Sequence, residues 1–365
     1  MVRSIIIVIQ MILSALLVRA WMTPSEPWHW KVSIAMLEFG HWLIFPALLS
    51  TLIGGLLVRG TIRWLPMTLG LLVAAASLIP SWQASKLDHH FSWSRLWSFD
   101  GPPAIAPLQR KTYWRSHKDA LDALIYRPAD TTTKPTPWIL YLHSGGWDRG
   151  DPDEFPVWHK HLASHGYAIV AMRYHLAPEH KWPAQKEDVR NAVKWVTEHA
   201  AELNIDPDRL ILMGRSAGGQ IATACAATMP DIKAKGCIAF YSPMDLEFAH
   251  TWSTEDDIIQ ALKLLRNYLG GDPEDVSENY RSASAINFVN AKTTVPTLLI
   301  HGRRDALVWV EQSIRYKAKF EKVGITDRCT FVELPWAVHA FDYFPNSPGG
   351  QISLDETVQF LKQFQ

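Results

Sequence analysis

The 365-residue sequence predicts an α/β domain with a mostly parallel sheet, preceded by a membrane-embedded N-terminal segment. Two observations support this prediction. After residue 110, short apolar runs typical of buried strands alternate with helical patterns, as in βαβ units. Before residue 83, long apolar stretches carry few charges. We therefore expect a membrane segment at 1–82, a linker at 83–110, and one α/β domain at 111–365.

The composition excludes several classes of protein. Lys+Arg and Asp+Glu number 36 each, so the formal net charge is zero, whereas a nucleic-acid binder needs a basic surplus to neutralise phosphates. Hydrophobic residues make up 48% of the chain, which excludes a wholly disordered protein. The three cysteines lack pairing or metal-ligand spacing, so neither a disulfide scaffold nor a cysteine-rich zinc site is expected.

Three apolar stretches, 4–20, 33–58 and 64–82, are candidates for transmembrane helices. A helix rises about 1.5 Å per residue and the hydrocarbon core is about 30 Å thick, so about 17–25 residues are needed to cross it. All three stretches meet this requirement, the first only just. The alternatives are a cleaved signal peptide for the first stretch and buried soluble helices for the other two. We expect about three transmembrane helices.

The orientation follows from the basic residues that flank these stretches. Three spans place the N-terminus and the α/β domain on opposite sides of the membrane. Basic loops favour the cytoplasm, and the short turn between Arg59 and Arg63 is the most basic connection. This predicts an extracytoplasmic α/β domain in a multi-pass membrane protein, although Lys86 and Arg95 favour the opposite orientation.

The elements of the α/β domain are expected from apolar runs and helical periodicity. The predicted strands are Ala123–Tyr126, Trp138–His143, Ala168–Tyr174, Arg209–Met213, Gly236–Tyr241, Thr297–His301 and Cys329–Leu334. The predicted helices are Ala184–Leu203, Ala217–Thr228, Val310–Val323 and Leu354–Phe364. The stretch 245–280 is long for a connection, contains its own helical pattern, and is a candidate cap insertion.

The sequence Gly214-Arg-Ser-Ala-Gly218 carries the strongest chemical signal. The Gly-x-Ser-x-Gly pattern alone is weak, but here it lies between an apolar strand and a helix, which is the context of a nucleophile elbow. The glycines permit a sharp turn, and the helix N-terminus favours negative charge. Ser216 is therefore a candidate nucleophile, and the alternative is a glycine-rich turn with an idle serine.

A second motif, His143-Ser-Gly-Gly-Trp147, follows another predicted strand. Glycines at this position allow backbone N–H groups to turn toward a developing oxyanion. The motif is close to the His-Gly-Gly-Gly loop of esterases and lipases. It indicates a loop that binds an oxyanion, and the alternative is a plain glycine turn.

A nucleophilic serine needs a base, and the base needs an orienting carboxylate. Enzymes with such an elbow carry them in the chain order Ser, acid, His. Only His250, His301 and His339 lie downstream of the elbow. Asp305 follows one predicted strand and His339 follows the next, so we predict Asp305 as the acid and His339 as the base. His301 is expected to support the loop that carries Asp305.

With these motifs, residues from about 120 to the end resemble the α/β-hydrolase superfamily, in the branch of hormone-sensitive-lipase-like and acetyl- or feruloyl-esterase-like carboxylesterases. The matching sequences are His143–Trp147 with Gly150-Asp151, Tyr174–His180 with Trp182–Ala184, Gly214–Gly219, His301–Asp305 and His339–Phe341. The resemblance implies an α/β-hydrolase fold, with oxyanion donors at the later glycines of the loop, Gly145 and Gly146, together with the Ala217 amide of the elbow. It departs at Ser144, which replaces the first glycine of the oxyanion loop, and at Arg215, where many relatives carry an acid.

The motifs predict a serine hydrolase, carboxylesterase- or lipase-like, that acts on a small-molecule or lipid ester through an acyl-enzyme. No metal or organic cofactor is expected to be required. Two alternatives stay open. One is an amidase, formamidase or acyltransferase with the same triad. The other is a non-catalytic binding protein on a hydrolase scaffold, as in the gibberellin receptors. The sequence does not indicate the oligomeric state.

Overall fold

The structure is a computed structural model that describes residues 2–58, 60, 64–98, 101–106, 108–117, 119–129 and 134–365. The chain divides into two compact units. The sheet unit comprises residues 100–301, 307–333 and 356–365. The helical unit comprises residues 1–99, 302–306 and 334–355. The helical unit therefore includes two short segments from the C-terminal half of the chain.

The sheet has eight strands in the order β1-β2-β4-β3-β5-β6-β7-β8. Their bounds are β1 Gln109–Arg115, β2 Ala120–Tyr126, β3 Thr136–Leu142, β4 Ala168–Met172, β5 Ile205–Arg215, β6 Gly236–Phe240, β7 Thr297–Gly302 and β8 Cys329–Leu334. The pairs β3/β4, β3/β5, β5/β6 and β6/β7 are parallel, whereas β2 is antiparallel to both β1 and β4. The predicted mostly parallel sheet is confirmed.

All seven predicted strands are present, and β1 is an additional strand. The prediction Cys329–Leu334 coincides with β8, whereas the other six differ from the observed strands at one or both ends. The sequence of β1, Gln-Arg-Lys-Thr-Tyr-Trp-Arg, is largely polar because β1 lies at an edge of the sheet and is only partly buried. Charged side chains on an edge strand discourage pairing with other chains. The search for apolar runs therefore missed this strand.

The helices outside the N-terminal region are α6 Pro156–Ser164, α7 Ala184–Glu198, α8 Ala200–Leu203, α9 Ala217–Thr228, α10 Leu246–Trp252, α11 Ala261–Leu269, α12 Ser277–Ala283, α13 Glu311–Lys322 and α14 Pro348–Leu361. The predicted helix 184–203 is interrupted at His199, whose backbone leaves the helical conformation and separates α7 from α8. The predicted C-terminal helix starts six residues earlier than expected, at Pro348, a residue that favours the first turn of a helix.

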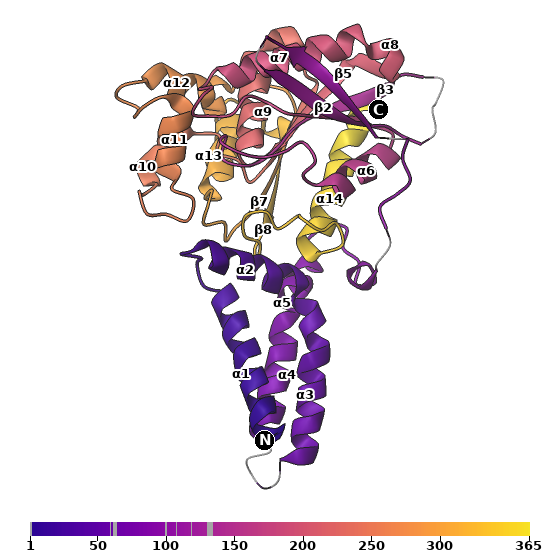
Figure 1. Ribbon diagram of the computed structural model, residues 1–365, viewed down its shortest axis with the longest axis vertical. Helices are drawn as coiled ribbons and strands as arrows, with labels where there is room; N and C mark the ends of the chain where they lie inside the picture. The colour runs from indigo at the N-terminus through magenta and orange to yellow at the C-terminus, as the bar shows by residue number, and fades with distance from the viewer. Residues whose placement is uncertain are drawn as a thin grey trace. The chain divides into compact units, whose positions relative to one another are not determined.

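Side chains of the central strands alternate between the two faces of the sheet. Leu140 of β3 packs in one apolar cluster with Val189 of α7 and Ile221 of α9, which cover that face (Figure 1). The next residue, Tyr141, points to the opposite face, where its ring lies 4.5 Å from the ring of His159 in α6. The central strands are buried on both faces, which explains their continuous apolar sequences.

The helical unit contains α1 Val2–Ala20, α2 Pro27–Phe39, α3 Ile44–Leu57, α4 Trp64–Ser77 and α5 Ile79–Ala84, and α1, α3 and α4 lie together as a bundle (Figure 1). Two continuous helical stretches, Pro27–Leu57 and Trp64–Ala84, are long and apolar enough to cross a membrane, and Ile5–Ala20 is a shorter apolar helix. Two of the three predicted spans thus meet the length criterion. The turn at Arg59 and Arg63 lies outside the described residues.

The bundle has an apolar exterior and polar contacts inside. The exposed faces carry large apolar side chains such as Leu52, Leu56 and Leu72, each more than 60% exposed. In contrast, Gln10 of α1 is fully buried, and its amide donates hydrogen bonds to the Ser50 hydroxyl at 3.0 Å and the Pro66 carbonyl at 2.8 Å. Interhelical hydrogen bonds between such side chains are typical of helices that pack in a membrane.

Candidate active site

Ser216 lies at the turn between β5 and α9, with φ 51° and ψ −121°. Such a positive φ is uncommon for a residue with a side chain and costs about 1–3 kcal/mol. The Ser216 amide donates a hydrogen bond to the Phe240 carbonyl of the neighbouring strand at 2.9 Å, which anchors the strained residue. The sharp turn predicted from the motif is therefore present.

The two glycines that flank this turn are required by close backbone contacts. A Cβ atom on Gly214 would lie 2.3 Å from the carbonyl carbon of Gly218, and a Cβ atom on Gly218 would lie 2.2 Å from the Leu142 carbonyl oxygen. Neither backbone atom moves aside easily. The motif spacing thus reflects the geometry of the turn, in which the start of α9 approaches both β5 and the end of β3.

The glycine loop, residues 143–150, emerges beside this turn. Leu142, the last residue of β3, pairs with Gly214 of β5 in parallel register. Both loops therefore leave the same edge of the sheet as neighbours. Gly145 and Gly146 have positive φ angles of 117° and 62°. Ala217 is the first residue of α9, where backbone N–H groups have no partner within the helix.

Ser144 attaches the glycine loop to the carboxylate of Glu154, a partly buried residue. Its amide and hydroxyl donate to the two oxygens of Glu154, at 2.5 and 2.8 Å, and the Tyr141 hydroxyl also donates to Glu154 at 2.7 Å. Burial raises the pKa of Glu154. Burial lowers the pKa of His143 to about 4, so this histidine is neutral and cannot serve as a cation. The hydrogen bonds of Ser144 with Glu154 anchor the glycine loop.

Asp305 and His339 form a buried pair in the helical unit. The Nδ1 atom of His339 lies 2.7 Å from Oδ2 of Asp305, and the two side chains are 8% and 0% exposed. A carboxylate at Nδ1 favours the tautomer that leaves the Nε2 lone pair available to accept a proton. The predicted acid and base are therefore brought together, while the pairing of His339 with Ser216 stays a prediction.

The loop that carries His339 is held by helix α2. The indole Nε1 of Trp30 donates to the His339 carbonyl at 2.9 Å. Glu38, only 1% exposed, accepts hydrogen bonds from Trp336 Nε1 at 2.9 Å and from the Gly349 amide at 2.8 Å. These residues lie some 300 positions apart in sequence, so no local pattern indicated their contact.

The other two histidines downstream of the elbow have structural partners. His301 contacts the Val308 carbonyl through Nε2 and the Ser313 hydroxyl through Nδ1, both at 2.8 Å. This agrees with its expected role in supporting a loop. His250 lies in α10 of the predicted cap and contacts Asp272 at 2.8 Å.

Arg215 occupies an unexpected environment next to Ser216. Its side chain is fully buried, and its guanidinium carbon lies 4.1–4.6 Å from the ring centroids of Phe155, Trp158 and Phe240. Stacking on aromatic faces stabilises a buried guanidinium through cation–π contacts. The side chain therefore lies in an aromatic cage, a placement that the sequence did not predict.

An apolar pocket lies within the sheet unit beside the glycine loop. Its lining includes Trp147 of that loop, Ala249 of α10, Leu264 and Leu265 of α11, and Trp309. A Cβ atom on Gly146 would lie 3.0 Å from a methyl group of Leu264, so α11 directly contacts the glycine loop. The stretch predicted as a cap thus contributes α10 and α11 to this pocket.

Comparison with known proteins identifies the family. The profile of the BD-FAE family matches residues 122–320, more than half of the chain. The chain belongs to the BD-FAE family. The matched region of this BD-FAE protein includes the glycine loop, the elbow and Asp305, and it ends before His339.

Several relatives of this BD-FAE protein are named esterases. In Mycobacterium tuberculosis, "Probable carboxylic ester hydrolase LipM" is 28% identical over 65% of this chain and 56% of its own length, and "Esterase LipC" is 26% identical over 68% and 65%. The chain thus spans less than two thirds of either relative. Esterase 2 of Thermogutta terrifontis, phosphoramylated by tabun, superposes with a TM-score of 0.58 and 26% identity, over 72% of this chain and 96% of that structure. The α/β-hydrolase fold and the resemblance to carboxylesterases are confirmed.

Proposed function

We propose that this BD-FAE protein is a serine carboxylic ester hydrolase in which Ser216, His339 and Asp305 form the triad. The observation that carries the proposal is the strained conformation of Ser216 on a strand-to-helix turn beside the glycine loop. The buried hydrogen bond between His339 and Asp305 supports it, as do the esterase relatives. Ser216 follows β5, Asp305 follows β7 and His339 follows β8, in the chain order of such enzymes.

In the proposed reaction, His339 Nε2 accepts the hydroxyl proton as Ser216 Oγ attacks the ester carbonyl. The negative charge that develops on the carbonyl oxygen is stabilised by amides of Gly145, Gly146 and Ala217. The tetrahedral intermediate expels the alkoxide, which takes the proton from His339. Water then attacks the acyl-enzyme with the same base and releases the acid. Asp305 stabilises the imidazolium formed in both halves.

A fluorophosphonate probe tests this function directly. The full chain in detergent should be labelled at Ser216 and should hydrolyse p-nitrophenyl acetate. A change that removes the labelling should also remove the turnover. In the same assay, amide substrates measure amide hydrolysis, and added alcohol or amine acceptors measure acyl transfer. Absence of labelling on correctly folded protein would reject a catalytic serine and favour a binding protein.

The pocket beside the glycine loop is proposed to accept an apolar group of the ester. Its walls from α10 and α11 are mostly apolar, and Leu264 contacts Gly146, one of the proposed oxyanion donors. Replacing Leu264 by tryptophan is expected to fill the pocket. The kcat/KM for hexanoate or octanoate esters should then fall by about 10-fold or more relative to acetate, since each methylene buried in a pocket contributes about 1 kcal/mol. An unchanged chain-length profile would place the acyl group elsewhere.

The N-terminal helices are proposed to anchor the enzyme in a membrane with three spans and an extracytoplasmic catalytic domain. Two stretches of sufficient length, a third apolar helix and the exposed leucines of the bundle support anchoring. A lipid ester or another ester near the bilayer would then be accessible. Retention in the membrane after alkaline carbonate washing tests the anchoring, and cleavage of the large domain by protease added to intact cells tests the orientation. Release of the protein by the wash would contradict membrane anchoring. Full protection of the large domain from the protease would contradict the extracytoplasmic orientation.

A further inference from the structure

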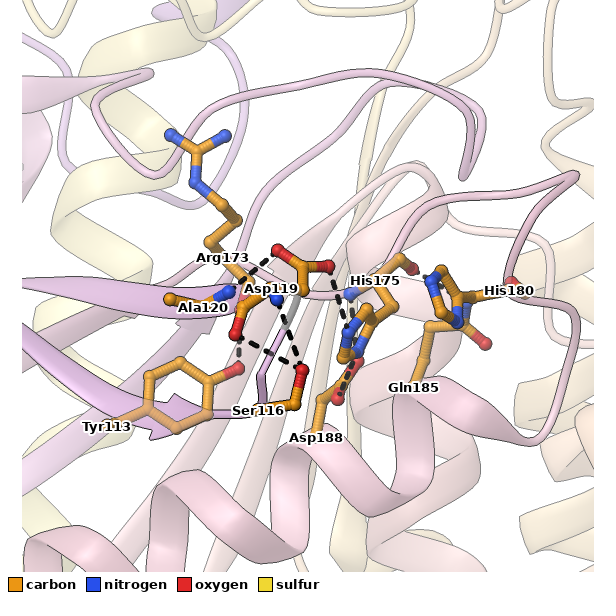
Figure 2. Close-up of polar contacts among 9 residues, drawn as sticks. All are labelled: Tyr113, Ser116, Asp119, Ala120, Arg173, His175, His180, Gln185 and Asp188. Atoms are coloured by element: carbon orange, nitrogen blue, oxygen red, sulfur yellow. Dashed lines mark hydrogen bonds and ion pairs between the residues drawn. The ribbon is translucent and has the colours of Figure 1, made fainter.

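A cluster of three side chains outside the proposed triad has the composition of a metal site. Asp119, His175 and His180 each offer one ligand atom, and these three atoms lie within 4.8 Å of one another (Figure 2). Asp119 lies between β1 and β2, whereas both histidines lie on the loop between β4 and α7. The cluster therefore joins two segments of the sheet unit that are more than 50 residues apart.

His175 is held in an orientation that suits a metal ligand. Its Nδ1 lies 2.7 Å from Oδ1 of Asp188, and its own backbone amide donates to Oδ2 of Asp188 at 2.8 Å. The Trp114 ring covers it from the side, with centroids 4.9 Å apart. A carboxylate at one ring nitrogen fixes the tautomer and directs the lone pair of the other nitrogen outward, as in carboxylate–histidine–zinc arrangements. In His175 this other nitrogen is Nε2, which faces Asp119.

Asp119 directs one of its two carboxylate oxygens toward that nitrogen. Its Oδ1 accepts a hydrogen bond from the Ala120 amide at 2.7 Å, while Oδ2 lies 3.4 Å from His175 Nε2. Two donors bound to one tetrahedral zinc ion at about 2.1 Å lie about 3.4 Å apart. The observed separation is longer than a good hydrogen bond and matches two ligands that share a cation.

His180 is fixed relative to His175 by a single buried side chain. The amide of Gln185, itself fully buried, donates to the carbonyl of His175 at 2.7 Å and to the carbonyl of His180 at 2.8 Å. The two imidazole rings lie 4.2 Å apart between centroids. Figure 2 shows His180 beside His175, with Gln185 and Asp188 beneath them. Packing of the backbone therefore brings two imidazoles and one carboxylate together before any ligand binds.

We propose that Asp119, His175 and His180 bind one divalent transition-metal cation of the zinc class. Two histidines and one carboxylate form a common ligand set for zinc, with water in the remaining position. Asp119 and His180 are exposed, so a cation reaches the site from solution. The proposed role is structural, because the loop that carries both histidines also holds the glycine loop: the Ala177 amide donates to the Trp147 carbonyl at 2.9 Å.

Zinc titration of the full chain in detergent, purified through a tag without histidines, tests the proposal. We expect one Zn²⁺ per chain by calorimetry and a rise in Tm of roughly 5 °C at saturating Zn²⁺, reversed by EDTA. Co²⁺ bound at the same site should give visible absorption. The His180→Ala variant, which removes an exposed ligand, should lose at least about 10-fold in Zn²⁺ affinity, and Asp188→Asn should weaken it by about 10–100-fold.

The matched control is His165→Ala, which removes an exposed histidine on another surface and should bind Zn²⁺ as the wild type does. If the wild type shows no Zn²⁺-dependent change in Tm, the contacts of His175 with Asp119 and Asp188 serve the fold without a metal, and the proposal is wrong. Equal Zn²⁺ affinity in wild type, His180→Ala and Asp119→Asn would also reject it, since binding would then occur elsewhere.

Discussion

Ser216→Ala is expected to lower kcat for a short-chain p-nitrophenyl ester by on the order of 10⁴-fold or more. Loss of the hydroxyl removes the nucleophile, so acylation cannot begin, and only stabilisation by the remaining site accelerates attack by water. Alanine retains the Cβ atom, and the turn keeps its anchoring hydrogen bond from the residue 216 amide to Phe240. The measurement is steady-state turnover of the purified variant, with its Tm as a check on folding.

The matched control for this variant is Ser242→Ala. Ser242 is also a buried serine beyond the end of a central strand, but its hydroxyl donates to the Phe240 carbonyl at 2.8 Å and has no proposed chemical role. The activity of the Ser242→Ala variant should stay within about 10-fold of the wild type, since the loss of one such hydrogen bond costs about 0.5–1.5 kcal/mol of stability. Undiminished turnover in Ser216→Ala would instead assign the activity to another nucleophile.

The sequence predicts the parts of the site that follow from short motifs and from the order of the strands along the chain. Gly214 and Gly218 are glycines because backbone atoms approach within 2.3 Å of where a Cβ atom would lie, so the turn is visible as a short motif. Asp305 and His339 follow consecutive strands, and their order along the chain was sufficient to predict a pair that the structure joins at 2.7 Å. The central strands were predicted because burial on both faces requires apolar side chains throughout.

The contacts that the sequence did not predict depend on distant residues. The cage around Arg215 combines aromatic rings from β6 and from the region of α6, and no spacing rule connects them. Strand β1 lies at an edge of the sheet and is only partly buried, so its sequence contains no apolar run. The cluster of Asp119 with His175 and His180 forms only when β2 pairs with β4. In each case the partner is set by the tertiary fold.

The contact between α2 and the loop that carries His339 has consequences for the proposed enzyme. The sequence suggests a membrane segment separate from the catalytic domain, yet Glu38 and Trp30 of α2 bind the loop residues that surround the proposed base. The helical unit accordingly contains both Asp305 and His339. We infer that α2 positions the proposed base, in addition to the membrane attachment proposed for the N-terminal helices.

Glu38→Ala is therefore expected to lower both the stability and the activity. The substitution leaves two buried donors, Trp336 Nε1 and the Gly349 amide, without their acceptor, at a cost of about 1–3 kcal/mol each. Trp336 precedes His339 by three residues, so relaxation of this loop should displace the imidazole. A misplacement of about 1 Å lowers kcat by on the order of 10²-fold. The measurements are kcat and KM for the ester, together with Tm.

Two further variants separate positioning from general damage to the fold. Lys31→Ala alters an exposed residue of the same helix and should leave kcat and Tm near their wild-type values. Glu38→Gln keeps one acceptor oxygen and should recover part of kcat, because only one of the two donors then faces an amide NH₂ group. KM should change less than kcat in both Glu38 variants, since the apolar pocket beside the glycine loop does not include this residue. Wild-type kcat in Glu38→Ala would show that α2 does not position the base.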